Sequence, residues 1–244
     1  MKTAIFIPAR MASTRFPNKP MAVISGVPMI ERVWQQGIKS NIGDVFVACS
    51  ENEVFDHILS KGGKAIMTDP NLPTGTDRVY AAFSSLENNK DYESIINLQG
   101  DMPLIDPKNI QSVNLPLKKG YDIGTLATNI SKDEEKNENI TKVSIDWKKS
   151  NVGNSIDFYK SYKKDITDIY QHVGIYSFKP NALKKFVSLP PSKNEMLRKL
   201  EQLRALDAGM SIGITYVENI PISVDTIKDL MLIENIIKRN NAKN

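Results

Sequence analysis

The chain has 244 residues, of which 41% are hydrophobic and 25% charged, as expected for a globular protein with a sizeable core. A net charge of +4 suits an anionic substrate, but it is too small and too dispersed to predict a nucleic-acid surface. The single cysteine excludes an intrachain disulfide, and no apolar stretch approaches the ~20 residues of a membrane span. We therefore expect a cytoplasmic protein that does not insert into membranes.

The first half of the sequence alternates short apolar runs with amphipathic segments. Strands are expected at residues 3–7, 44–48, 64–67 and 94–98. Helices are expected at residues 29–38, 51–61 and 76–85. This alternation is typical of parallel strands covered by helices on both faces. It predicts the α/β class, with a doubly wound, mostly parallel, Rossmann-like sheet.

The second half is less regular. Strands are expected at residues 122–129, 142–146, 170–178 and 211–217. Helices are expected at residues 181–187, 195–206 and 226–238. In the helix 195–206, the spacing of the apolar residues predicts that one stripe faces the core. That stripe consists of Met196, Leu197, Leu200 and Leu203.

A basic loop follows the first strand directly. It holds Arg10, Arg15 and Lys19 with two small hydroxyl residues and no acid. Ligands of open parallel sheets bind beyond the carboxyl ends of the strands, and a triphosphate needs converging cations and N–H donors. The loop suits a triphosphate, although it is neither a Walker motif nor GxGxxG, and a solvated basic loop is the alternative.

Two acids and one helix start are further candidates. Asp101 follows the strand 94–98 behind Gly100, and Asp225 precedes the last helix. Carboxylates in these places suit Mg²⁺, but Asp101 also fits an ordinary turn and Asp225 also fits a helix cap. Thr74 or Thr76 fits the cap of the helix that follows, whose N–H groups are suited to the edge of a pyrimidine base.

Taken together, these segments resemble the CMP-Kdo synthetases, the 3-deoxy-manno-octulosonate cytidylyltransferases. The resemblance covers almost the whole chain in family order, and the joint match is far more specific than any single motif. The family patterns and the matching residues are PARxxSTRxPxKP at 8–20, SGTER at 74–78, NxQGDEP at 97–103, HLGIYxY at 172–178, LEQLR at 200–204 and GVDTPEDL at 223–230.

The resemblance implies an Mg²⁺-dependent transfer of CMP from CTP to an acidic sugar, Kdo, usually by a homodimer. It implies that Arg10, Arg15 and Lys19 hold the CTP phosphates, and that Asp101 and Asp225 hold magnesium. The remaining implied substrate-binding residues are Pro8 and Ala9 in the basic loop, Gly75, Thr76 and Arg78 near the cytidine, Gln99 near the sugar, and Lys160, His172, Tyr176, Glu201 and Gln202 in the sugar pocket.

The same resemblance implies one nucleotidyltransferase domain over residues 1–244. Residues of about 1–120 form its CTP-binding half, and residues of about 121–225 form a small extension for sugar binding and dimerisation. The C-terminal helix occupies residues 226–244. The bland alternatives are a core histidine for His172 and solvated helix positions for Glu201 and Gln202.

The chain also departs from the family pattern. The family's Ser-Arg-x-x-x-Pro stretch is missing, and Lys160 is the expected substitute for its arginine. Lysine offers a single charged ammonium group, whereas arginine can form two parallel hydrogen bonds. Arg198 stands where a glutamate is common, and Met102 replaces the glutamate of the GDEP motif. Two alternatives therefore stay open: a different or modified ulosonic acid, such as 8-amino-Kdo or a sialic-type acid, and an inactive homologue that binds nucleotide.

Overall fold

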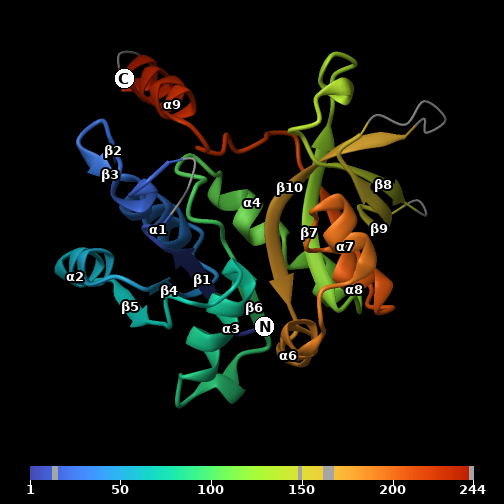
Figure 1. The fold of residues 1–244 in the computed structure, drawn as a ribbon, viewed down its shortest axis with the longest axis horizontal. Coiled ribbons are helices and arrows are strands. Elements are labelled where there is room, and N and C mark those ends of the chain that lie inside the picture. The colour runs from blue at the N-terminus through green and yellow to red at the C-terminus, as the bar shows by residue number, and fades with distance from the viewer. Residues whose placement is uncertain (13–15, 148–149, 162–167, 242–244) are drawn as a thin grey trace. The chain divides into compact units, whose positions relative to one another are not determined.

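The computed structural model describes residues 1–12, 16–147, 150–161 and 168–241 (Figure 1). The chain forms two compact units. The N-terminal unit comprises Lys2–Tyr92, Asn97–Ile110 and Pro221–Asn244, so the C-terminal helix belongs to it. The central unit comprises Met1, Glu93–Ile96 and Gln111–Ile220.

The N-terminal unit is built on three parallel strands in the order β5-β4-β1. These strands are β1 (Thr3–Ala9), β4 (Gly43–Cys49) and β5 (Lys64–Met67). The helices α1 (Met29–Lys39) and α3 (Gly75–Ser84) pack on β1 and β4, and α2 (Asn52–Ser60) packs on β4 and β5. Each parallel connection carries a helix, as the alternating sequence pattern predicts.

The core of this unit explains why β1 is a continuous apolar run. Ile5, Phe6 and Ile7 have no exposed surface, because helices cover the strand. The Phe6 ring stacks on Phe46 at 5.1 Å between centroids and meets Phe83 edge-on at 6.2 Å. Cys49 is fully buried, as expected, and burial raises the pKa of its thiol to about 11.

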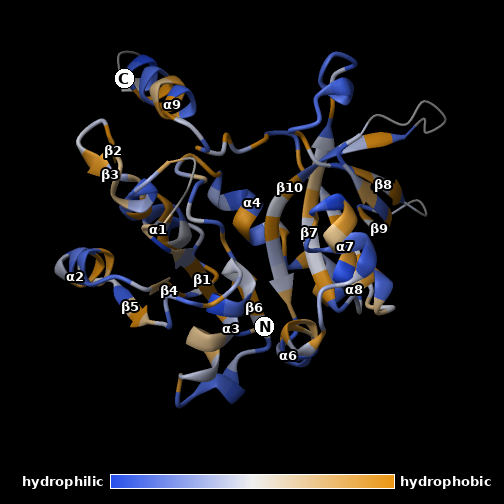
Figure 2. Cartoon of the chain, in the orientation of Figure 1, coloured by the Kyte–Doolittle hydropathy of each residue, from blue (hydrophilic) through white to orange (hydrophobic). Residues whose placement is uncertain are grey.

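A second cluster joins the C-terminal helix to a short hairpin. The hairpin comprises β2 (Val23–Ile24) and β3 (Val27–Pro28), and it follows the 3₁₀ helix η1 (Lys19–Met21). Helix α9 (Ile227–Asn241) contacts β2, beside which it lies in Figure 1, and its buried Ile233 packs with Ile24, Met29 and Val224. Hydrophobic and hydrophilic residues alternate along α9 in Figure 2, consistent with a helix that buries one face.

The central unit contains a mixed sheet in the order β6-β10-β7-β11-β9-β8. Its strands are β6 (Ser94–Asn97), β7 (Ile123–Asn129), β8 (Lys142–Asp146), β9 (Val152–Tyr159), β10 (Ile169–Phe178) and β11 (Ile212–Tyr216). Its helices include α5 (Leu115–Lys118), α6 (Pro180–Ser188), α7 (Lys193–Arg198) and α8 (Leu203–Asp207). Two further 3₁₀ helices are η2 (Asn89–Asp91) and η3 (Glu134–Lys136), and α4 (Pro107–Ser112) runs from one unit into the other.

The α/β class is confirmed, but the expectation of a mostly parallel sheet is wrong for the central unit. There β10 pairs antiparallel with β7 and β8, and β9 pairs antiparallel with β8 and β11, while β11 and β7 are parallel. Only five residues separate β8 from β9, and so short a link permits only antiparallel pairing. Strand β9 itself was missed.

The single helix expected at residues 195–206 is also wrong. Helix α7 ends at Arg198, and Lys199 adopts a left-handed conformation with φ 55° before α8 begins at Leu203. Leu200 and Leu203 are buried as predicted, but Met196 and Leu197 are 64% and 75% exposed. Because the helix is broken at Lys199, the side chains of α7 and α8 do not form the single apolar stripe that a continuous 3.6-residue period predicts. No helix in the described part of the chain is long and apolar enough to cross a membrane.

Candidate active site

A pocket of about 280 Å³ lies in the N-terminal unit, where β1 ends. Segments far apart in the sequence line it: the end of β1, η1, the start of α3, the turn after β6 and Asp225, two residues before α9. The residues predicted for the CTP phosphates, the cytidine and magnesium that line it are Pro8, Ala9, Arg10, Lys19, Gly75, Arg78, Asp101 and Asp225, and Gln99, which was predicted to lie near the sugar, lines it as well. The pocket thus combines three cationic side chains with two carboxylates.

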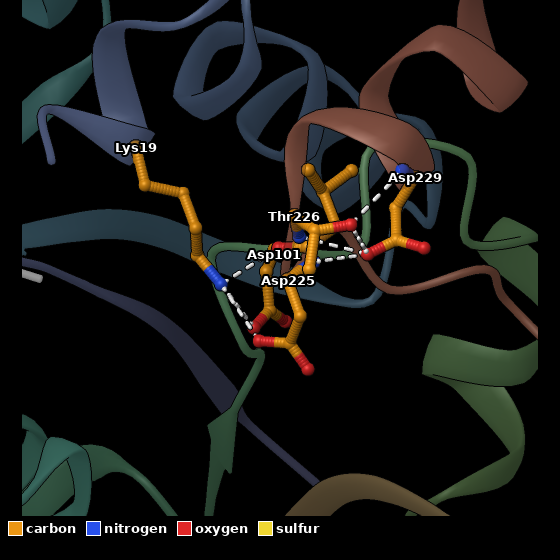
Figure 3. Close-up of polar contacts among 6 residues, drawn as sticks. Lys19, Asp101, Asp225, Thr226 and Asp229 are labelled. Carbon is orange, nitrogen blue, oxygen red and sulfur yellow. Dashed lines mark hydrogen bonds and ion pairs between the residues drawn. The ribbon is translucent and has the colours of Figure 1, made fainter. Parts of the chain in front are cut away.

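Lys19 is the centre of the charged group (Figure 3). Its Nζ donates to Asp101 Oδ2 at 2.9 Å, to Val224 O at 2.8 Å and to Asp225 Oδ1 at 3.4 Å. The side chains of Lys19 and Asp101 are 18% and 24% exposed, whereas that of Asp225 is 44% exposed. One ammonium therefore partly neutralises two acids that stand 124 positions apart in the sequence.

The backbone around Asp101 explains how these segments meet. Leu98 N–H donates to Phe6 O, which ties the segment before Gly100 to β1 within the N-terminal unit. A Cβ on Gly100 would lie 2.9 Å from Pro8 O, so only glycine lets the turn approach β1 this closely. The small size of Gly100 therefore allows the close approach of the two backbone segments that carry Pro8 and Asp101.

The start of α9 holds Asp225 in place, but Asp225 is not its cap. Asp229 Oδ2 accepts the N–H groups of Asp225 and Thr226 at 3.1 and 2.8 Å, and the Thr226 hydroxyl at 2.9 Å. Burial opposes ionisation of Asp229, but these hydrogen bonds outweigh it and lower the pKa of its carboxyl group. The cap thus comes from Thr226 and Asp229, and the Asp225 carboxylate contacts Lys19 instead.

The start of α3 presents a buried arginine to the same pocket. Thr74 is the cap, since its hydroxyl oxygen accepts from Asp77 N–H at 3.1 Å. Arg78 is 2% exposed; its Nη1 donates to the Thr68 hydroxyl, and its Nη2 has no hydrogen-bond partner among the described residues. Burial lowers the pKa of Arg78, with Glu51 opposing the shift. A buried guanidinium with an unused N–H group in a pocket is suited to an anionic or carbonyl oxygen.

Thr76 and Gln99 are joined through Asn97. Gln99 Nε2 donates to Asn97 Oδ1 at 2.9 Å, and Asn97 Nδ2 donates to Thr76 Oγ1 at 3.3 Å. Thr76 is buried and is not among the residues that line the pocket. Its position indicates that it supports the pocket wall, while Gln99 reaches the pocket.

Apart from Gln99, the sugar-side residues lie in the central unit, where His172 and Tyr176 form one cluster. Their rings are 5.5 Å apart between centroids, and the Phe158 ring meets His172 edge-on at 5.1 Å. Both rings keep some exposed surface, yet the protein around them disfavours charge. Burial lowers the pKa of His172 to about 3 and raises the pKa of Tyr176, with Glu201 adding to the second shift. Both groups are neutral near pH 7.

A bulge in β10 shapes this cluster. The pairing with β7 passes from Val173↔Leu126 to Tyr176↔Thr125, so two residues of β10 have no partner there. The Thr125 hydroxyl lies 2.8 Å from Ile175 O and 2.9 Å from His172 Nε2. Because a hydroxyl has one proton, donation to Ile175 makes Thr125 the acceptor from His172 Nε2–H. The bulge lies between His172 and Tyr176, whose rings are in contact.

The other sugar-side residues are divided between this cluster and a separate cavity. Gln202 is buried at the start of α8, and Glu201 precedes it close enough to influence Tyr176. Lys160 lines a cavity of about 340 Å³ together with Arg198. Arg198 Nη1 donates to Asp157 Oδ1 at 2.6 Å, which pairs the unusual arginine with an acid of β9.

Of the predicted residues, Arg15 lies outside the described part of the chain. Other features of the site were not predicted. The Val224 carbonyl and Asp229 were not singled out, although the Thr226-x-x-Asp229 spacing is a capping-box signal that precedes an apolar run. Met102, the departure from the GDEP motif, is 5% exposed and belongs to the core.

The chemistry of the charged group fits a divalent ion. Carboxylate oxygens are the ligands that Mg²⁺ prefers, and it uses one or two of them with water and substrate phosphates. Asp101 and Asp225 contact the same ammonium, so a cation is already accommodated between them. The described residues contain no group of three or more acids, histidines or cysteines that would form a complete metal cage. Two carboxylates suit an ion that shares its coordination with a substrate.

Comparison with known proteins identifies the family of the chain. The family model for cytidylyltransferases matches residues 4–212. The 3-deoxy-manno-octulosonate cytidylyltransferase of Paramagnetospirillum magneticum is 42% identical over 238 residues, covering 96% of this chain and 97% of the relative. The enzyme of the same name from Rickettsia bellii is 43% identical, covering 93% and 92%.

Solved structures extend the comparison to the fold. CMP:2-keto-3-deoxy-manno-octonic acid synthetase in complex with CTP has a TM-score of 0.90 and 30% identity, covering 98% of this chain and 100% of that one. A 4-diphosphocytidyl-2C-methyl-D-erythritol synthase from Anaerococcus prevotii, at 12% identity and a TM-score of 0.66, shares the fold alone. The chain belongs to the 3-deoxy-manno-octulosonate cytidylyltransferase family.

Proposed function

We infer that this protein transfers CMP from CTP to the anomeric hydroxyl of Kdo, giving CMP-Kdo and pyrophosphate. One observation carries the inference: in a chain of this family, the end of β1 gathers cationic side chains and two carboxylates that share one ammonium. That combination suits a triphosphate and its counterion, whereas a pocket for a neutral ligand would have no use for it.

The chain's own residues supply binding and electrostatic stabilisation. The anomeric oxygen attacks the α-phosphorus of CTP, the bond from that phosphorus to the bridging oxygen of the β-phosphate breaks, and the hydroxyl proton passes to solvent. Arg10 and Lys19, with Arg15 by resemblance, hold the phosphates and stabilise the departing pyrophosphate. Arg78 offers its unused N–H group to the nucleotide. Such transfers depend on positioning and charge, so no covalent nucleophile is required.

Asp101 and Asp225 are the residues that would hold magnesium. Bound there, the ion would supply Lewis-acid neutralisation of phosphate charge. Lys19 keeps the two carboxylates together before any ion arrives, since its ammonium bonds to both. Loss of that contact leaves Lys19 available for a phosphate oxygen, which reconciles the predicted phosphate role with its observed partners.

On the sugar side, the residues proposed for the acceptor are Lys160, His172, Tyr176, Glu201 and Gln202 in the central unit and, by resemblance, Gln99 in the N-terminal unit. Neutral His172 and Tyr176 are suited to bonds with sugar hydroxyls, and Lys160 is suited to the carboxylate. Lys160 and Arg198 differ from the family pattern, so a modified ulosonic acid, such as 8-amino-Kdo or a sialic-type acid, is the second candidate acceptor.

A cytoplasmic homodimer is part of the proposal. The central unit exposes Ile156, Met196 and Leu197, which are 61%, 64% and 75% accessible. Apolar side chains of this size at the surface often belong to a protein–protein contact. We therefore place the predicted dimer contact on the central unit, the sugar-binding and dimerisation region of the proposed single domain.

A screen of pyrophosphate release tests the function. Purified protein is offered CTP, UTP, GTP or ATP with Mg²⁺ and each of Kdo, 8-amino-Kdo and N-acetylneuraminate. We expect release with CTP and Kdo above every other pair. Faster release with another acid would reassign the acceptor. Binding of CTP without release from any pair would support the inactive homologue.

A further inference from the structure

The segment that carries Asp225 is held at four backbone atoms. Val224 N–H donates to Asp101 O at 2.9 Å, and Val224 O accepts from Lys19 Nζ at 2.8 Å. The N–H groups of Asp225 and Thr226 both donate to Asp229 Oδ2. The first two bonds tie the segment to the proposed metal and phosphate residues, and the last two tie it to α9. Little freedom remains for the backbone at Asp225.

Asp229 is the hub of the second pair of bonds (Figure 3). One of its oxygens accepts three donors, because the Thr226 hydroxyl joins the two N–H groups. In return, Asp229 N–H donates to Thr226 Oγ1 at 3.4 Å. This reciprocal pattern is a capping box, in which a negative charge also suits the positive end of the helix.

We propose that Asp229 is a positioning residue for the active site: it fixes the backbone of Asp225 so that the Asp225 carboxylate meets the same cation as Asp101. The proposal rests on the proposed function for what that cation does. Its basis is a division of labour. Thr226 and Asp229 cap α9, and the Asp225 carboxylate contacts Lys19.

Two other roles for Asp229 make different predictions. As a third metal ligand, Asp229 would need an oxygen directed at the ion, but its Oδ2 accepts three local donors, and the described residues contain no three-acid metal group. As a helix cap alone, Asp229 would affect stability without affecting the cation. The three roles therefore differ in how metal binding responds to substitution.

The test compares Asp229→Asn and Asp229→Ala with wild type. Asparagine keeps an acceptor oxygen for the N–H groups, whereas alanine removes it. Mn²⁺ binding is measured without substrates by electron paramagnetic resonance. For D229A we expect the dissociation constant to rise on the order of tenfold. This factor corresponds to the free energy of a lost helix cap, if that loss falls on the position of Asp225. The Mg²⁺ concentration for half-maximal pyrophosphate release rises by a similar factor, and KM for the sugar stays unchanged. D229N stays within about threefold of wild type because the acceptor remains.

The matched control is Glu134, which makes the same kind of reciprocal hydrogen bonds with Ser131, three residues before it. Its Oε2 accepts the Ser131 hydroxyl at 2.6 Å and the Ser131 N–H at 3.3 Å. Glu134 belongs to the central unit and lines neither described cavity. E134A is expected to leave both Mn²⁺ binding and the Mg²⁺ dependence unchanged.

Three outcomes separate the possibilities. Unchanged Mn²⁺ binding in D229A overturns the positioning role and leaves a cap alone. A loss in D229N as large as in Asp225→Asn overturns it in favour of a direct ligand. If wild type releases no pyrophosphate, the proposed function fails, but Mn²⁺ binding by wild type, D229N and D229A still decides the role of Asp229.

Discussion

The pocket of the N-terminal unit and the His172–Tyr176 cluster of the central unit solve opposite electrostatic problems. In the pocket, Lys19, Asp101 and Asp225 remain partly exposed and compensate one another's charge. In the cluster, burial keeps His172 and Tyr176 uncharged, so they can contact a ligand only through hydrogen bonds and packing. The comparison contrasts a charged pocket in the N-terminal unit with an uncharged ring cluster in the central unit, and under the proposed function the first binds the triphosphate and the second binds sugar hydroxyls. Each prediction below tests one side of that division.

Asp101→Asn has the largest expected effect. The substitution keeps the shape but removes the charge that faces Lys19 and the proposed ion. Turnover, measured as pyrophosphate release from CTP and Kdo, is expected to fall by roughly two to four orders of magnitude, as for the loss of a main electrostatic stabiliser. Circular dichroism should stay unchanged.

The control for this variant is Asp106→Asn, five residues further along. Asp106 Oδ1 accepts from Lys108 N–H at 2.8 Å, and Asp106 does not line the pocket. D106N is expected to turn over within about twofold of wild type, as for a surface substitution. Near-normal turnover of D101N would contradict the assignment of Asp101 as a metal-binding residue.

Lys19→Ala is expected to act on the nucleotide rather than on the sugar. A charged hydrogen bond contributes ~1.5–3 kcal/mol, so KM for CTP should rise about tenfold to a hundredfold, while KM for Kdo changes little. Steady-state kinetics with each substrate varied in turn measures the difference. Lys2→Ala is the control, because Lys2 pairs with Asp91 at the surface, where such pairs contribute little. An equal loss for both substrates would make Lys19 a structural residue.

These predictions draw on a site that was largely readable from sequence. Arg10, Lys19, Asp101 and Asp225 follow strands or precede a helix, and parallel topology brings such ends together. What the sequence did not reveal is a backbone contribution: the Val224 carbonyl on Lys19 depends on the path of a loop, which residue types do not encode. The three hydrogen bonds that Asp229 Oδ2 accepts were not predicted, because the Thr226-x-x-Asp229 spacing alone predicts only the start of a helix.

The fold shows the same limit. In the N-terminal unit the parallel strands β1, β4 and β5 each lead to a helix of clear periodicity, so local pattern and tertiary structure agree there. In the central unit, Lys199 adopts φ 55°, a conformation that residue type does not predict, and it ends a helix whose apolar spacing continues through Leu200 and Leu203. Strand β9 was missed because its apolar positions are interrupted by the polar residues Asn154, Ser155 and Asp157.

Lys160→Ala tests whether the central unit contributes any charge to the substrate. If Lys160 meets the sugar carboxylate, KM for Kdo should rise about tenfold with KM for CTP unchanged, the size expected for one charged hydrogen bond. Lys160→Arg keeps the charge and should recover most of the affinity. Lys184→Ala, an exposed position on α6, is the control. Unchanged kinetics in K160A would leave the cluster to act through neutral groups alone.

His172→Gln has the smallest expected effect, and it reports on burial rather than catalysis. The pKa of His172 is about 3 in the folded protein, below the 6.5 of an unperturbed histidine. The unfolded chain therefore binds the proton first, so wild-type stability is complete above pH 6.5 and declines as the pH falls toward 3, by at most about 1.4 kcal/mol per pH unit. Urea unfolding at pH 7 and pH 4.5 should show a smaller acid-induced loss for H172Q than for wild type. His57→Gln, which alters the other histidine, should not reproduce that difference; if it did, the acid sensitivity would not come from the cluster, and the contrast between a charged and a neutral site would lose its main support.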